Sequence, residues 1–126
     1  MYWFSNGVAF LVSAGIIAIG AMYILNPRGA TQSFGLPLPE EGANIAWWLR
    51  LKGVRDIVSG LVVLAMMAWG EPRLVGIVLL IEAFTAVGDM SVILSAKGST
   101  KAAFGMHGLT AAVMMLAAVP LIIGIV

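Results

Sequence analysis

The sequence predicts an all-α protein that lies in a membrane as an up-down bundle of four helices. Of its 126 residues, 61% are hydrophobic and only 10% are charged, whereas soluble domains carry about 25% charged residues. The apolar stretches approach the roughly 20 residues that a helix needs to cross a bilayer. Two of the three connections are short, so successive helices should be antiparallel neighbours. Residues 1–126 are expected to form a single transmembrane domain.

Four stretches carry the helical pattern. They cover about residues 7–25, 45–69, 72–96 and 101–126. Ser5 or Asn6 is expected to cap the first helix, which Asn26 and Pro27 end. Pro72 suits the first turn of the third helix, and Gly98 is expected to cap its C-terminus. Pro120 is expected to kink the fourth helix.

The first connection, residues 26–44, is the only long one. It is rich in Pro and Gly, yet it also carries Phe34, Leu36 and Leu38. Loops longer than about 12 residues are often lids or binding loops. Two interpretations remain open, a lid over a site and an interfacial spacer with a few apolar anchors.

The distribution of Lys and Arg predicts the orientation in the membrane. The first and third loops hold Arg28, Lys97 and Lys101, whereas the opposite face holds Arg73. The positive-inside rule therefore places these two loops in the cytoplasm and both termini outside the cell membrane.

Composition also excludes several classes of function. The net charge of +1 and the absence of a basic, aromatic-rich cluster argue against nucleic acid as a partner. Without cysteine there is no disulfide framework, thiolate nucleophile or cysteine metal site. Neither a metal nor a cofactor is expected. Haem ranks last for His107 because no second axial ligand is evident.

The segment from Trp47 to Gly60, WWLRLKGVRDIVSG, concentrates charge inside an otherwise apolar helix. An Arg, Lys or Asp at mid-helix costs roughly 2.5 to 3.5 kcal/mol, so these residues need partners, water or a function. Lys52, Asp56 and Ser59 are spaced i, i+4, i+7 and share one face, with Arg55 beside them. Arg50 is out of phase, and we interpret it as snorkelling or as pairing with Glu40 and Glu41.

Depth predicts that three helices bring ionisable groups to one level. At about 1.5 Å per residue, Lys52, Asp89 and His107 each lie roughly 10 Å below the cytoplasmic face, and Asp56 lies roughly 16 Å below it. Glu82 lies deeper on the face of Asp89. A neutral carboxylic acid there could donate a proton, or simply bond to a backbone carbonyl or to Ser13.

These positions define the candidate site. The predicted catalytic residues are Asp56, Asp89, His107 and Glu82. The predicted substrate-binding residues are Lys52, Arg55, Ser59 and Thr110. The structural alternative is a set of salt bridges that holds the second, third and fourth helices together, with His107 as a hydrogen-bonded bundle residue.

Short motifs suggest a family. With K-G-V-R-D at 52–56, G-D at 88–89, H-G-L-T at 107–110 and F-G-L-P at 34–37, the chain resembles small four-helix membrane proteins of bacteria and fungi catalogued as a domain of unknown function. The similarity covers nearly the whole chain. It implies the four-span architecture and no reaction. The residues whose importance it implies are Lys52, Arg55, Asp56, Asp89 and His107.

Three functions follow as hypotheses. The leading one is a polar intramembrane site for a small lipophilic molecule, possessed by a cofactor-free acid–base enzyme such as an isomerase, a cyclase or an epoxide-opening enzyme. The second is a small transporter or proton-coupled carrier, which four helices could form only as a homo-oligomer. The third is a structural or accessory subunit that contacts membrane lipid or a partner.

Overall fold

A computed structural model of the chain describes residues 1–37 and 42–125. Within these residues the chain is all α, without a strand. Three long helices are α1 (Tyr2–Leu25), α3 (Ile45–Trp69) and α4 (Pro72–Ser95). The shorter elements are α2 (Pro27–Thr31), α5 (Thr100–Ala102), the π-helical segment η1 (Ala103–Gly108) and α6 (Leu109–Ile123). The last three run on without a break as one helical stretch, Thr100–Ile123.

Among the described residues, three helical stretches could cross a membrane by length and composition: Tyr2–Leu25, Pro72–Ser95 and Thr100–Ile123. Large apolar side chains are exposed on them, as Leu11, Phe84 and Leu116 show. Such surfaces are typical of helices that face lipid. These features are consistent with a membrane protein.

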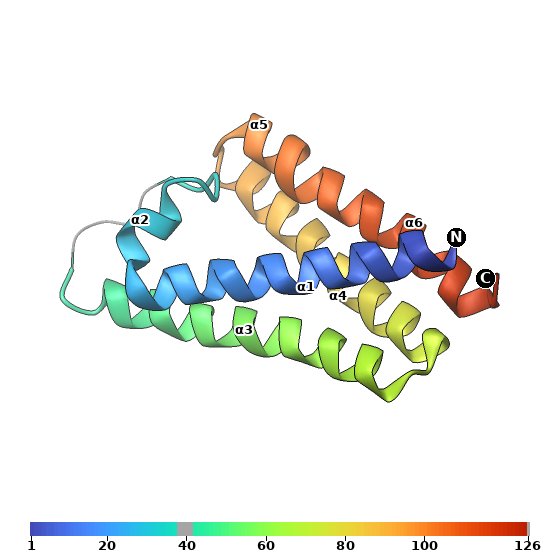
Figure 1. The fold of residues 1–126 in the computed structure, drawn as a ribbon. Helices are drawn as coiled ribbons and strands as arrows, with labels where there is room; N and C mark the ends of the chain where they lie inside the picture. The colour runs from blue at the N-terminus through green and yellow to red at the C-terminus, as the bar shows by residue number, and fades with distance from the viewer. Residues whose placement is uncertain (38–41, 126) are drawn as a thin grey trace.

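The long helices form two pairs. α1 packs along α3, and α4 packs along α6. The two pairs approach each other at the end that holds both termini and diverge toward the end that holds α2 and α5 (Figure 1). The buried core lies where the pairs meet. It contains Ala9, Val63, Val75, Leu79, Ala83, Met114, Ala117, Ala118 and Leu121.

Glycines let α1 and α3 approach closely. A Cβ atom on Gly53 would lie 2.5 Å from the carbonyl oxygen of Gly20, and one on Gly60 would lie 2.7 Å from that of Ser13. Small residues at such crossings allow membrane helices to pack backbone against backbone. The spacing of these glycines therefore determines which face of α3 is left for the interior.

The start of the first helix and the end of the last helix differ from the expected boundaries. α1 begins at Tyr2, so Ser5 and Asn6 lie inside the helix, and the prediction that one of them caps it is wrong. The Asn6 side chain instead donates to the Tyr2 carbonyl at 2.9 Å. Helix formation through these residues satisfies backbone groups that lipid cannot. α6 ends at Ile123, where Gly124 takes a left-handed conformation with φ 80°; Val126 lies outside the described residues.

The described residues of the first connection that follow α2 lead toward the α4–α5 turn at the open end of the bundle (Figure 1). At this turn the Gly35 carbonyl accepts a hydrogen bond from the Ser99 amide at 2.8 Å. Gly35 has φ 110°, a conformation open to glycine. The helix-capping residue in the left-handed conformation is Lys97, with φ 55°, rather than the predicted Gly98. Gly98 is needed for space, because a Cβ there would collide with the Gly35 carbonyl.

Part of the first connection cannot be compared with expectation. Leu38, Glu40 and Glu41 lie outside the described residues, and so does the predicted pairing of Arg50 with the two glutamates. The described part, residues 27–37, reaches the α4–α5 turn through the Gly35–Ser99 hydrogen bond, and the lid and the spacer both stay open as predictions.

Candidate functional site

A cavity of about 420 Å3 lies between the two helix pairs, on the side of the core where they diverge. Its deep end is apolar and includes Val12, Val63 and Met114. Its other end lies beneath the first loop, where Ser33 and Phe34 form part of the wall. The volume and the mixture of apolar walls with a few polar groups are typical of small-molecule sites.

Seven of the eight predicted site residues line this cavity. They are Lys52, Asp56 and Ser59 of α3, Glu82 and Asp89 of α4, His107 of η1 and Thr110 of α6. They converge because α3 and α4 are antiparallel, so the first half of α3 lies at the same level as the second half of α4. The structure thus brings the ionisable groups of three helices to a common space.

Arg55 is the exception. Its side chain is exposed and does not line the cavity. On an α-helix it points about 100° away from its neighbour Asp56, toward the outer surface. The structure therefore does not bring Arg55 to this cavity, and its binding of a ligand stays a prediction.

Arg50 has a structural role. Its Nε donates to the Ile24 carbonyl at the C-terminus of α1, at 3.1 Å. This carbonyl lacks an intrahelical partner, and a cation at a helix C-terminus also suits the helix dipole. The guanidinium lies 5.0 Å from the centre of the Trp47 ring. Arg50 thus joins α1 to α3 and takes no part in the cavity.

The Lys52 ammonium is enclosed by one carboxylate and two rings. Its Nζ lies 2.7 Å from Asp56 Oδ2. It also lies 4.2 Å from the centre of the Tyr23 ring and 4.9 Å from that of Phe34. Cations at such distances are attracted to the ring faces. Lys52 is therefore held at the cavity wall, with a third of its side chain still exposed.

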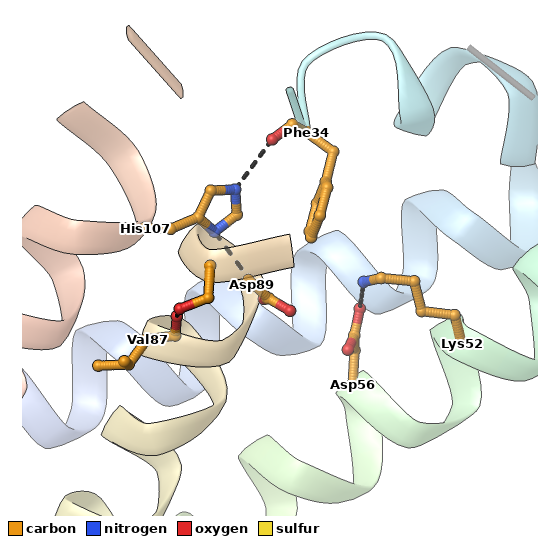
Figure 2. A network of polar contacts seen from close by, with 7 residues as sticks. Phe34, Lys52, Asp56, Val87, Asp89 and His107 are labelled. Carbon is orange, nitrogen blue, oxygen red and sulfur yellow. Dashed lines mark hydrogen bonds and ion pairs between the residues drawn. The ribbon is translucent and has the colours of Figure 1, made fainter. Parts of the chain in front are cut away.

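His107 connects the first loop to α4 (Figure 2). Its Nε2 lies 2.9 Å from the Phe34 carbonyl oxygen. A carbonyl can only accept, so Nε2 carries the proton, and in the neutral ring Nδ1 is left as an acceptor. Nδ1 lies 3.8 Å from Asp89 Oδ2, too far for a direct hydrogen bond. Both atoms thus keep bonding capacity for a third group placed beside them.

Glu82 has a partner on α3. Ser59 Oγ donates a hydrogen bond to Glu82 Oε2. The expected alternative partner, Ser13, instead donates to the Ala9 carbonyl of its own helix at 2.6 Å. A second polar pair therefore lies about two helical turns deeper than Asp89, between α3 and α4.

Among the residues that the structure describes, no three His, Cys, Asp or Glu side chains gather closely enough to hold a metal ion. The polar end of the cavity brings together three kinds of ionisable group. It presents an imidazole nitrogen, a carboxylate facing it, and an ammonium that can donate to an oxygen atom of a ligand.

A family model described as "Domain of unknown function (DUF4267)" matches residues 13–121. The chain belongs to this family. The match includes every residue of the candidate site and confirms the resemblance drawn from the motifs. No curated protein and no solved structure matches the chain.

Two aromatic residues of this DUF4267 chain were not assigned to the site from sequence. Tyr23 is 2% exposed and lines the cavity, whereas a tyrosine near a helix end suggests only an interfacial position. The Phe34 ring packs against His107 at a tilt of 55°, with ring centres 4.6 Å apart. Its place in the F-G-L-P motif was the one sequence feature that could have assigned Phe34 to the site.

The π-helical segment was also not predicted. η1 carries His107 and lies directly against α4, where a Cβ on Gly108 would lie 2.9 Å from Met90 Sδ. Single π-helical turns are frequent at functional sites because they change the direction of side chains in an otherwise regular helix. Gly105 and Gly108, either side of His107, are the only sequence features that hint at this irregularity.

Proposed function

We propose that this DUF4267 protein is a four-span membrane protein whose cavity binds a small lipophilic molecule, and that Asp89, His107, Asp56 and Lys52 make it a cofactor-free acid–base enzyme. The observation that carries the proposal is the convergence of these four side chains on one end of an otherwise apolar cavity. Such a site suits a molecule with a hydrocarbon body and one polar end.

The fourth span would be α3. Its 25 residues extend over about 37 Å, longer than the hydrocarbon layer. Its outer face exposes Val54, Val58 and Leu61, each by about half, which is unfavourable in water. Its charged residues fall in the first half, near the end where lysines and arginines gather, and Lys52 and Asp56 point to the cavity.

The positive-inside rule supports an orientation for these four spans. The first loop and the α4–α5 turn carry Arg28, Lys97 and Lys101 and lie at one end of the bundle, whereas both termini lie at the other (Figure 1). The cavity would then open beneath the cytoplasmic surface of the cell membrane.

The chemistry would be a transfer of protons within one substrate, as in an isomerisation, a cyclisation or the opening of an epoxide. His107 Nδ1 could accept or return a proton beside Asp89, and the Lys52 ammonium could donate a hydrogen bond to a substrate oxygen. The apolar walls would exclude water, which strengthens such interactions. No redox change is involved, because a proton removed at one atom is returned at another.

The geometry gives less support to a purely structural role. Salt bridges that hold helices together should run between helices, yet Lys52 pairs with Asp56 four residues along the same helix. Lys52 and Asp56 therefore satisfy each other, and the polar side-chain contacts that link α4 to its neighbours across the cavity are the Ser59–Glu82 bond and the longer Asp89–His107 contact.

The test begins with the protein purified from membranes in mild detergent. Co-purifying lipophilic compounds are extracted and identified by mass spectrometry from the wild type, from Val63→Trp, which fills the deep end of the cavity, and from Val62→Trp on the outer face as a control. We expect a compound that is present with the wild type and Val62→Trp and is lost with Val63→Trp.

Conversion of that compound is then measured with Asp89→Asn and His107→Gln. An enzyme should lose conversion while thermal stability stays close to that of the wild type. If no compound distinguishes the cavity variant and both polar substitutions chiefly lower the melting temperature, the structural role replaces the proposal.

A further inference from the structure

We infer that the ligand is an uncharged amphiphile dissolved in the bilayer, which enters sideways between α1 and η1 and places its polar group beneath the first loop. This inference rests on the proposed function of the cavity and adds the route and the class of ligand.

Several contacts hold the described part of the first loop against the cavity. The Phe34 carbonyl binds His107, and the Gly35 carbonyl binds the Ser99 amide. Gly98 packs so closely on Gly35 that a single added carbon would collide. Ala30 of α2 is 5% exposed and lines the cavity from this side. A ligand arriving from the aqueous phase would have to break this set of contacts.

The wall between α1 and η1 is different. Ile19, Met22 and Met106 all line the cavity, yet they are 41%, 51% and 47% exposed. α1 packs against α6 but has no comparable packing against η1, because the helix pairs diverge at this level. Two of the three rim residues are methionines, whose flexible side chains adapt to a passing molecule.

The opposite seam, between α3 and α4, is bridged. There the Ser59 hydroxyl is hydrogen-bonded to Glu82 across the two helices. The passage between α1 and η1 therefore needs no polar contact to be broken, and its rim is apolar. We name it the α1–η1 seam, with Ile19, Met22 and Met106 as its rim.

The charges of the route and of the site select an uncharged ligand. A charged group drawn past the apolar rim within the bilayer would cost several kcal/mol. Inside, the cavity is lined by three carboxylates, Asp56, Glu82 and Asp89, and by one ammonium, that of Lys52, which pairs with Asp56, so an anion would meet more negative than positive charge. A hydroxyl group fits better, because its O–H can donate to His107 Nδ1 or to Asp89 Oδ2, two acceptors that lie 3.8 Å apart.

The experiment uses the full chain in lipid nanodiscs and a long-chain alcohol that carries a photoreactive diazirine on its alkyl chain. The carboxylic acid and the amine of the same chain are the matched probes. Cross-linked residues are mapped by mass spectrometry, with labelling of Val12, Val63 and Met114 as the measure of entry to the deep end. We expect the alcohol to label these residues, and the acid and the amine to label only outward-facing residues.

The route is tested with two variants of the rim, Ile19→Trp and Met106→Trp. Leu109→Trp is the control, because Leu109 is 59% exposed and does not line the cavity. Both rim variants should lose deep labelling by the alcohol, whereas the control should keep it; thermal unfolding confirms that each variant is folded.

The outcomes separate the two proposals. Deep labelling that persists in both folded rim variants overturns the route and leaves the cavity site standing. Equal deep labelling by the acid or the amine overturns the uncharged class. If the alcohol never labels the deep residues of the wild type while a cavity ligand is still found by extraction, this inference alone fails; if neither is seen, the proposed function fails with it.

Discussion

Phe34 contributes to the site through both its backbone and its ring. Its carbonyl accepts a hydrogen bond from His107 Nε2, its ring packs at a tilt against the imidazole, and the same ring lies beside the Lys52 ammonium. A loop residue thus selects the tautomer of a candidate base on one helix and covers a cation on another. The role resembles that of a group that orients a catalytic histidine, here supplied by a main-chain oxygen.

Substitutions of His107 should separate this anchoring from proton transfer. The amide of His107→Gln can still donate to the Phe34 carbonyl, so the loop should stay in place while proton-dependent activity is lost. His107→Leu removes the donor and should increase hydrogen exchange at residues 32–37. Exchange measured by mass spectrometry checks both variants, and equal loop protection in the two would contradict the anchoring role.

Lys52→Met should leave the Asp56 carboxylate without its partner. Hydrogen bonds to charged groups contribute about 1.5 to 3 kcal/mol, and because a third of the Lys52 side chain is exposed we expect a loss near the lower limit. Thermal unfolding in detergent measures it.

Arg55→Met provides the matched control, since this neighbouring cation is exposed and outside the cavity. The double variant Lys52→Met with Asp56→Asn should recover part of the loss, because no carboxylate is then left unpaired. An additive double variant would show that the pair has no coupling.

At the level of helices, packing of backbone on backbone orients the site. Gly20, Gly53 and Gly60 bring α1 against one flank of α3, which leaves Lys52, Asp56 and Ser59 on the flank that faces the cavity. η1 then alters the last helical stretch at the position of His107. The polar groups converge because these two features set the rotation of each helix about its axis.

Gly53→Ala should push α1 away from α3, since the added carbon would lie 2.5 Å from the Gly20 carbonyl oxygen. Overpacking of this kind costs about 1 to 3 kcal/mol. Gly88→Ala is the control within a helix. It has nothing within 4 Å and should stabilise the helix by about 0.5 to 1 kcal/mol. Melting temperatures that move in the same direction for both would argue against close packing at Gly53.

For the chain as a whole, the divergence of the two helix pairs matters most. The core occupies the end with the termini, and the cavity and the first loop occupy the other. A bundle packed evenly along its length would leave no room for a ligand. The loop joins the pairs at their widest separation through the Gly35–Ser99 bond (Figure 1).

Labelling of single introduced cysteines tests the proposed orientation, because the natural sequence contains no cysteine. Gln32→Cys reports on the first loop, and Glu71→Cys reports on the α3–α4 turn. If α3 spans the membrane, a maleimide that cannot enter intact cells should label only Glu71→Cys, and lysed cells should label both. Labelling of both positions in intact cells would show that α3 does not cross.

Hydropathy and turn residues were enough to predict an all-α membrane protein and the bounds of α3, 45–69, because apolar length and breakers such as Pro72 act locally along the chain. Helical spacing and depth also identified seven residues that line the cavity. These predictions could be made because depth along a helix follows from the rise of about 1.5 Å per residue and the order of the residues in the chain.

The rotation of each helix could not be obtained in this way. Glycine contacts between α1 and α3 decide that Arg55 faces outward and Lys52 faces inward. Tyr23 and Phe34 join the site because segments distant in the sequence meet after folding. Contacts between distant parts of the chain set these directions, because a shift of one residue around a helix costs little locally and moves a side chain by about 100°.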